Sequence, residues 1–176
     1  MSDRRPSETE YAAPFARYVA RVPEVDVVSV LEKQGQQVVA ALGGLPDEKG
    51  GFRYAPGKWS VRELVGHVLD AERVFGHRVH HIARADPAPL PGFEENDYAA
   101  VAQHDRFPLA SLLAEFESLR RSHVLMLRHL DAEAWSRMGV ANESPVSMRA
   151  LVFIMAGHVR HHFAVLAERY GIPADV

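Results

Sequence analysis

The sequence predicts an all-α protein, a four-helix bundle built by a chain of 176 residues. Three observations support this fold class. Apolar residues recur at the spacing of amphipathic helices in four long segments. Capping residues mark the starts and ends of these segments, and no segment has the alternating pattern of a β-strand. Four apolar stripes of this kind are buried by packing the helices against one another.

The composition excludes several classes of protein. The chain has no cysteine, which excludes disulfides, thiolate metal sites and a cysteine nucleophile. Its formal net charge of -3 gives no indication of a nucleic-acid partner. No apolar run approaches the roughly 20 residues of a membrane span, and the polar N-terminus lacks the apolar core of a signal peptide. We therefore expect a cytoplasmic protein that acts on a small molecule, without nucleic acid or membrane.

The N-terminal part of the chain has no strong periodicity. We expect residues 1–24 to form a poorly anchored arm ahead of one bundle domain at residues 25–176. The first helix is expected after Asp26, a suitable N-cap, because apolar residues then follow at helical spacing through Leu42. The next segment, LGGLPDEKGGFRYAPGK, is rich in glycine and proline, which predicts a loop.

The second helix has the clearest start signal in the chain. Ser60 and Glu63 have the S-x-x-E spacing of a capping box. Trp59 and Leu64 stand at the N′ and N4 positions of a hydrophobic staple. These signals predict a helix that begins after Ser60 and runs to about Ala83.

A long connection separates the second helix from the third. Four prolines in DPAPLPGFEENDYAAVAQHDRFP argue against a continuous helix there, and a connection of this length can cross the end of a bundle. The third helix is expected over about Leu109 to Leu130. The last helix is expected to start near Ser147 and to end at Gly171, a typical C′ residue. Between them the sequence predicts a turn through Gly139, Asn142 and Pro145.

Histidines interrupt the apolar stripes of two helices. His158 and His162 are four residues apart, so they lie one turn apart on one side of the last helix and can chelate a single ion. His67 lies on the core side of the second helix and is the candidate third ligand. Three neutral imidazoles suit zinc, nickel, copper or iron(II) and leave positions open for water or substrate. The alternative is that these are ordinary histidines with hydrogen-bond partners.

Two further histidines lie close to these positions in the pattern. His161 is also spaced to chelate with His158; we instead assign it as a candidate proton carrier, or as a residue that flanks the core. His123 lies in the stripe of the third helix, where we expect a core histidine with a partner rather than a fourth ligand. The other five histidines are expected at the surface: His77, His80, His81, His104 and His129.

The charged residues of the helices offer fewer indications. Asp70 and Glu72 follow His67 and could orient a ligand ring, but we expect them to be solvated. Five arginines are expected on exposed helix faces: Arg62, Arg73, Arg120, Arg121 and Arg160. Nucleotide-binding glycine motifs, the G-x-S-x-G elbow and the E-x-x-H signature of di-iron bundles are all missing.

Two stretches of the sequence together resemble a known family, the DinB-like superfamily. They are WSVRELVGHVLDAERVFGHRV and ANESPVSMRALVFIMAGHVRHHFAVLAERYG. The resemblance covers about residues 25 to 171. It implies a bundle of up-down-down-up topology with its long crossover between the second and third helices. It also implies a divalent metal, often nickel or zinc, held by one histidine of the second helix and two of the last. These positions match His67, His158 and His162.

The resemblance further implies a function. Several members of the family resemble transferases or isomerases that use bacillithiol, mycothiol or glutathione, and dimers are common. We therefore expect a metal-dependent enzyme that transfers a bacillithiol-like thiol to an electrophile, with Ni²⁺ or Zn²⁺, or else Fe²⁺ or Mn²⁺, activating the thiol. A metal-dependent hydrolase is the close alternative. A non-catalytic protein that binds metal or a small ligand in a stress response is the other, as is a bundle whose histidines hold no metal.

Overall fold

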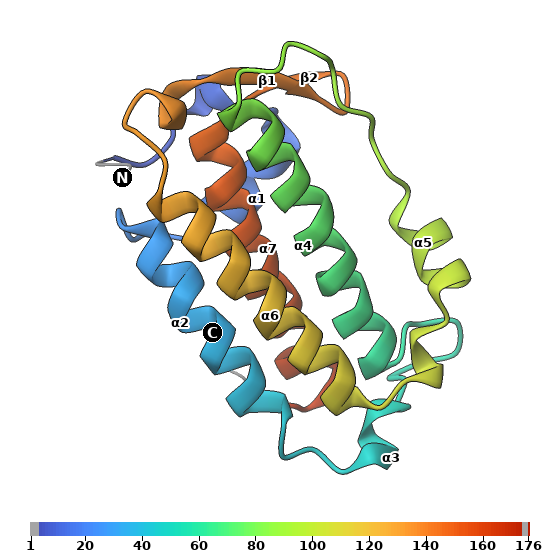
Figure 1. Ribbon diagram of the computed structural model, residues 1–176. Coiled ribbons are helices and arrows are strands. Elements are labelled where there is room, and N and C mark those ends of the chain that lie inside the picture. Colours follow the sequence, from blue (N-terminus) through green and yellow to red (C-terminus); the bar gives the residue numbers. More distant parts are fainter. Residues whose placement is uncertain (1–3, 174–175) are drawn as a thin grey trace.

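The structure, a computed structural model, describes residues 4–173 and 176. It confirms the helical bundle, in which four long helices pack side by side (Figure 1). These helices are α2 (Val27–Leu42), α4 (Val61–Ala83), α6 (Leu109–Arg128) and α7 (Met148–Tyr170). Each lies within two residues of its expected bounds, because the capping residues that delimit them are strong local signals.

The predicted caps form as the sequence indicates. The side chain of Asp26 accepts a hydrogen bond from the backbone N–H of Ser29 at the start of α2. Ser60 and Glu63 form the complete capping box of α4. Gly171 ends α7 in the left-handed conformation with a φ of 64°, which glycine adopts without strain.

Contacts between side chains give the directions of the helices. Arg73 bonds Glu115, and Gly76 lies against the ring of His123, so α4 and α6 run in the same direction. The long crossover between them makes this parallel arrangement possible. It carries the short helix α5 (Glu95–Ala102), which packs on α4 beside the bundle (Figure 1), and a 3-10 turn at His104–Arg106.

One residue of this crossover corrects an expectation. His104 was expected at the surface, but it is buried, and its ring packs on Gly66 of α4. A Cβ at Gly66 would stand 2.0 Å from that ring, so only glycine leaves room for it. The Nε2 of His104 lies 3.2 Å from Asp70. Asp70 is therefore engaged with the crossover rather than with His67.

The N-terminal segment is well anchored, so the expectation of a loose arm is wrong for residues 4–24. Tyr18, Val19 and Val22 are buried in the core. Glu10 forms a 2.7 Å ion pair with Arg149 of α7. These apolar residues are too few to produce a helical periodicity in the sequence, but in the structure they pack in the same core cluster as α7. The segment contains α1 (Ala16–Val19) and 3-10 turns at Glu8–Glu10 and Ala13–Phe15. The division of the chain after residue 24 stays a prediction.

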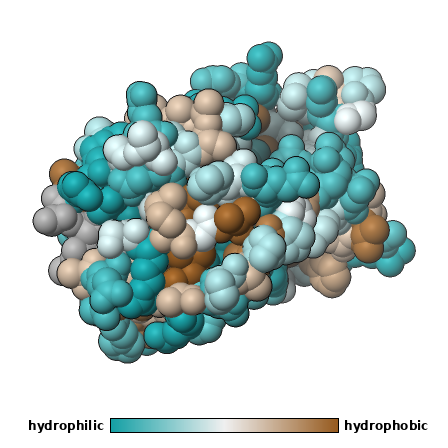
Figure 2. Space-filling view, turned by 90° about the horizontal axis from the view of Figure 1, so that it is seen from above, coloured by the Kyte–Doolittle hydropathy of each residue, from teal (hydrophilic) through white to brown (hydrophobic). Residues whose placement is uncertain are grey.

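A small hairpin covers one end of the bundle and was not expected. Its strands are β1 (Met138–Ala141) and β2 (Ser144–Ser147), antiparallel, with Asn142 and Glu143 at positive φ in the turn. Strands of four residues are too short to show alternation. Figure 2 looks onto this end and shows a small hydrophobic area among mostly hydrophilic residues. The remaining short helices are α3 (Asp47–Gly50) and the 3-10 turn Ala134–Ser136.

Helix α7 lies at the centre of the core. Among the described helices, α7 alone has the length and the mean hydropathy of a membrane span. Polar residues interrupt it, so the sequence shows no continuous apolar run of that length. Most of its apolar part is buried between the other helices, as in the core helix of a bundle.

Candidate metal centre

The three predicted ligands meet at one point between α4 and α7. His67 lies in the second turn of α4, and His158 and His162 lie one turn apart in the middle of α7. Their Nε2 atoms form a triangle in which every side is 3.1 Å. In the described part of the chain these are the three residues whose ligand atoms gather as for a metal ion.

Hydrogen bonds alone cannot satisfy this triangle. A neutral imidazole nitrogen is either a donor or an acceptor. Of three nitrogens that face one another, at least two must therefore have the same role, and one of the three contacts must be repulsive. A cation removes the conflict, because all three nitrogens can then direct lone pairs at it. The arrangement thus favours an ion over a network of hydrogen bonds.

The electrostatics of the site keep these lone pairs free. Burial lowers the pKa of His67 to about 4. Burial and the neighbouring histidines hold the pKa values of His158 and His162 well below the ordinary value. All three rings are therefore neutral at pH 7, and neutral imidazole is the form that binds metal.

The size of the triangle also fits a divalent transition metal. An ion at about 2.1 Å from each ligand, the usual metal–imidazole distance, reaches three nitrogens that are 3.1 Å apart. With three protein ligands the ion keeps positions open, as in catalytic sites. The donor set and its spacing therefore suit a divalent transition metal, and no thiolate competes because the chain has no cysteine.

Aromatic residues pack around the triangle and hold the rings. The ring of Trp59 lies 4.9 Å from that of His67, between centroids. Phe75 and Tyr18 pack edge-on against His158 at 5.6 and 5.4 Å. Trp59 stands just before the cap of α4, so the residue that starts the helix also supports its ligand. This packing limits rotation of the rings.

A carboxylate from the crossover approaches the triangle. The Oε2 of Glu95, the first residue of α5, lies 3.9 Å from the Nε2 of His67, and its side chain is half exposed. No motif in the sequence indicated this residue. Glu95 lies 28 residues from His67 in a segment without strong periodicity, so only the path of the crossover brings the two together.

A pocket of about 240 Å³ opens beside the triangle. His67, His158 and Glu95 line one part of it. Its other walls come from the N-terminal segment, α4, the crossover and the hairpin turn, through Pro14, Phe15, Arg17, Tyr18, Phe75, Arg78, Phe93 and Asn142. The segment that was expected to be loose thus forms one wall of the candidate active site.

The remaining predicted residues lie outside this pocket. His161 packs its ring on Tyr18 and His162 and is not among the lining residues, so its role as a proton carrier stays a prediction. His123 is a core histidine as expected: its Nδ1 lies 2.8 Å from Glu72. Glu72 and Arg120 were expected at the solvated surface, but both are buried. They form a bidentate ion pair with each other.

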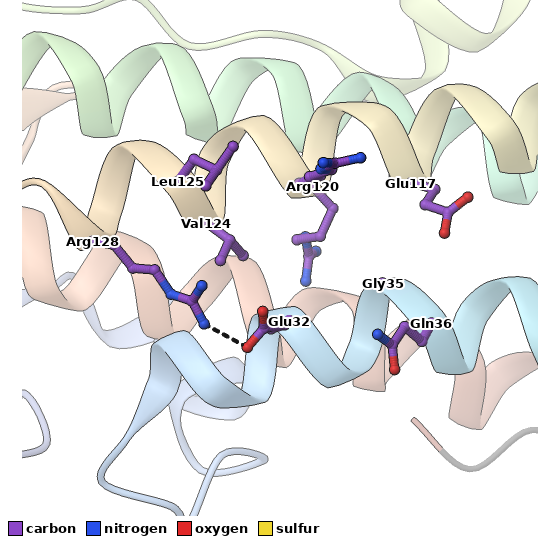
Figure 3. Close-up of a pocket in the computed structure, with 9 residues that line it drawn as sticks. Glu32, Gly35, Gln36, Glu117, Arg120, Val124, Leu125 and Arg128 are labelled. Atoms are coloured by element: carbon purple, nitrogen blue, oxygen red, sulfur yellow. Dashed lines mark hydrogen bonds and ion pairs between the residues drawn. The ribbon is translucent and has the colours of Figure 1, made fainter.

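A second hollow lies between α2 and α6, on the side of the bundle away from the triangle. It measures about 430 Å³ and is lined mainly by charged side chains, with an ion pair between Arg128 and Glu32 (Figure 3). Arg120 reaches inward from it to Glu72 (2.7 Å) and Gln34 (2.9 Å). Arg128 and Arg120 both have acidic partners here, Glu32 and Glu72 respectively.

Comparison with known proteins places the chain among helical bundles of one family. The sequence model of the DinB superfamily matches residues 31–166. A curated relative from Geobacillus kaustophilus, provisionally named a metal-dependent hydrolase, is 27% identical over 73% of both chains. A relative from Bacillus pumilus with the same name is 26% identical over 76% of this chain and 77% of its own.

Solved structures agree on the fold. YfiT from Bacillus subtilis, described as a probable metal-dependent hydrolase with an unusual four-helix bundle topology, superposes with a TM-score of 0.71 at 18% identity. The match covers 96% of this chain and 94% of YfiT. A mycothiol-dependent maleylpyruvate isomerase has a TM-score of 0.66 at 13% identity, covering 86% of this chain and 62% of the isomerase.

Proposed function

The chain belongs to the DinB superfamily, and we propose that it is a metal-dependent enzyme whose divalent ion is held by His67, His158 and His162. The single observation that carries the proposal is the triangle of Nε2 atoms, 3.1 Å on each side, which hydrogen bonds cannot satisfy. The names of the relatives and of YfiT support it. We propose zinc or nickel as the ion; iron(II) and manganese are alternatives.

The residues around the triangle have separable roles in this proposal. A bound divalent ion lowers the pKa of a coordinated thiol or water toward neutrality. Glu95 is placed to accept the proton that such a nucleophile loses, because its carboxylate lies beside His67 and reaches solvent. Phe75 and Tyr18 pack against His158 and line the adjoining pocket. The small molecule on which the enzyme acts occupies the adjoining pocket.

We propose a low-molecular-weight thiol of the bacillithiol type as the nucleophile, transferred to an electrophilic substrate. The chain has no cysteine of its own, so a thiol must come from a cosubstrate. The fold is shared with an isomerase that depends on mycothiol. Water is the second candidate, because several relatives are named as hydrolases. A cytoplasmic location and a homodimer belong to this proposal as well.

Metal content is the decisive measurement. Protein purified without a histidine tag should contain about one zinc or nickel ion per chain, as measured by inductively coupled plasma mass spectrometry. His67→Ala, His158→Ala and His162→Ala should each lose it. His77→Ala is the matched control, because His77 is exposed on the same helix as His67. Wild-type protein that takes up no ion even from added zinc or nickel would reject the proposal.

The nucleophile is then identified with the metal-loaded protein. Consumption of a model electrophile such as 1-chloro-2,4-dinitrobenzene that requires added bacillithiol, and that disappears in His67→Ala, supports thiol transfer. Hydrolysis of activated esters or amides without any thiol supports the hydrolase instead. If the protein binds one metal ion per chain but shows neither thiol transfer nor hydrolysis with these substrates, the result would favour a non-catalytic, metal-binding protein of the stress-response type.

A further inference from the structure

Three arginines are buried in the described part of the chain, and one of them lacks an acidic partner. Arg120 is 1% exposed and pairs with Glu72, and Arg149 is 4% exposed and pairs with Glu10. Arg78 is 5% exposed, and the structure gives it one hydrogen bond, to the backbone oxygen of Pro91 at 2.8 Å. Its Nε is buried without a partner.

A buried charge without a counter-ion is unfavourable. Burial lowers the pKa of Arg78, which shows the direction of this penalty. Arginine stays charged in proteins, so the penalty cannot be relieved by loss of a proton. The fold therefore keeps a guanidinium in a place where an anion would stabilise it and where the protein itself provides none.

Arg78 stands at a defined distance from the triangle along one wall of the pocket. It follows His67 by 11 residues on α4, which is about three turns and about 16 Å along the helix, so both face the same side. Both residues line the pocket beside the histidines. Helical side chains lean toward the N-terminus of their helix, which is the end of α4 where His67 lies.

Aromatic rings line much of the pocket between these two residues, together with the polar side chains of Arg17 and Asn142. Phe75 lies between them on the same helix, and Phe15 and Phe93 line the pocket from the N-terminal segment and the crossover. The carboxylate of Glu95 already occupies the space beside His67, at the other part of the pocket. An anionic group is therefore favoured at the Arg78 part of the pocket, and an apolar group in the middle.

We propose that Arg78 anchors a carboxylate or similar oxyanion of the substrate, while the rest of the molecule extends along Phe75 toward the histidines. This inference rests on the proposed function, because it assumes that the pocket receives the substrate. It assigns the substrate class as a small molecule with an apolar middle and an anionic end. A pocket of about 240 Å³ limits it to a compact ligand.

Binding of matched probes tests this assignment without requiring turnover. The probes are 3-phenylpropionate, its neutral amide, and 2-phenylethyl phosphate, titrated by calorimetry into metal-loaded and chelator-treated protein. We expect one or both anions to bind at least about tenfold more tightly than the amide, the effect of one charge-assisted bidentate contact. The stronger of the two identifies carboxylate or phosphate as the preferred group.

The variants assign that preference to one residue. Arg78→Met should abolish it, and Arg78→Lys should retain part of it. Arg121→Met is the matched control, because Arg121 is exposed in the hollow between α2 and α6, and it should bind as wild type. Melting temperatures of all variants verify that they are folded.

The outcomes separate this inference from the proposed function. A preference that persists in His67→Ala and in chelator-treated protein, but is lost in Arg78→Met, supports the anchor whether or not an ion binds. A preference that persists in Arg78→Met and is lost in His67→Ala would show that the anion binds the ion directly, which overturns the anchor and leaves the proposed function intact. Equal binding of the acids and the amide to wild type would also overturn it.

Discussion

Two regions of the bundle that bury polar groups differ in whether the protein itself supplies partners for those groups. On the side of α2 and α6, the carboxylate of Glu72 accepts a hydrogen bond from Arg120 at 2.7 Å and lies 2.8 Å from the Nδ1 of His123. Gln34 accepts a hydrogen bond from Arg120 and donates one to the backbone of α7. On the side of α4 and α7, three histidine nitrogens face one another, and Arg78 has no acid partner.

This contrast indicates which buried polar groups serve function. A completed network is explained by stability and by the fixed orientation of its helices. A region left incomplete by the protein is unfavourable until a ligand arrives, and such regions are typical of binding sites. Burial of histidine alone does not separate the two cases, since His123 and His158 both lie in apolar stripes.

The largest expected effect breaks the completed region. Arg120→Met leaves Glu72 buried with only His123 beside it, and we expect the free energy of unfolding to fall by about 3–5 kcal/mol. Urea denaturation measures the change. The double variant Arg120→Met with Glu72→Leu should recover part of the loss, because no uncompensated charge then remains. An unchanged unfolding midpoint for Arg120→Met would contradict this account of the network.

Removal of metal is the next largest effect and acts on the incomplete region. An ion that binds only the folded state stabilises it, by about 2.7 kcal/mol when its free concentration is one hundred times Kd. Chelation should therefore lower the melting temperature of wild type. The His67→Ala variant should show no such change. A wild-type melting temperature that stays constant after verified loss of metal would remove the stabilising role of the ion.

Arg78→Met should lower the free energy of unfolding far less than Arg120→Met does. Arg78 contributes a single hydrogen bond and carries the penalty of a buried charge. We expect the unfolding free energy to change by less than about 1 kcal/mol or to rise, because methionine fills much of the space without that penalty. Urea denaturation of Arg78→Met and Arg120→Met side by side compares their free energies of unfolding. A loss as large as that of Arg120→Met would mean that Arg78 is structural.

The last effect is a pH dependence, and it concerns the ion pair that fastens the N-terminal wall of the pocket. Hydrogen bonds from Arg149 and Ser147 outweigh burial and lower the pKa of Glu10 to about 2. The charged form is favoured in the folded state, so its stabilisation is complete above the ordinary pKa of 4.5 and is lost as the pH falls toward 2. Stability measured between pH 5 and about 2.5 should decline less steeply in Glu10→Gln. Identical slopes would contradict the assignment.

The elements that the sequence predicted well are those whose signals are local. The capping box at Ser60, the N-cap at Asp26 and Gly171 each act within one turn, so the helix bounds follow from neighbouring residues. The three candidate ligands followed from the same logic, because polar residues in an apolar stripe require an explanation. The structure brings these three together at 3.1 Å.

What the sequence by itself determined is therefore the set of helices, the faces they bury and the histidines on those faces. Only the tertiary structure decided which polar residues meet. Glu95, Phe15 and Arg78 come together from separate segments, and Glu72 finds Arg120 and His123 across α4 and α6. Periodicity records which side of a helix faces the core, but it carries no information on what lies opposite. That depends on the path of the crossover and of the N-terminal segment, which are fixed by packing rather than by local preference.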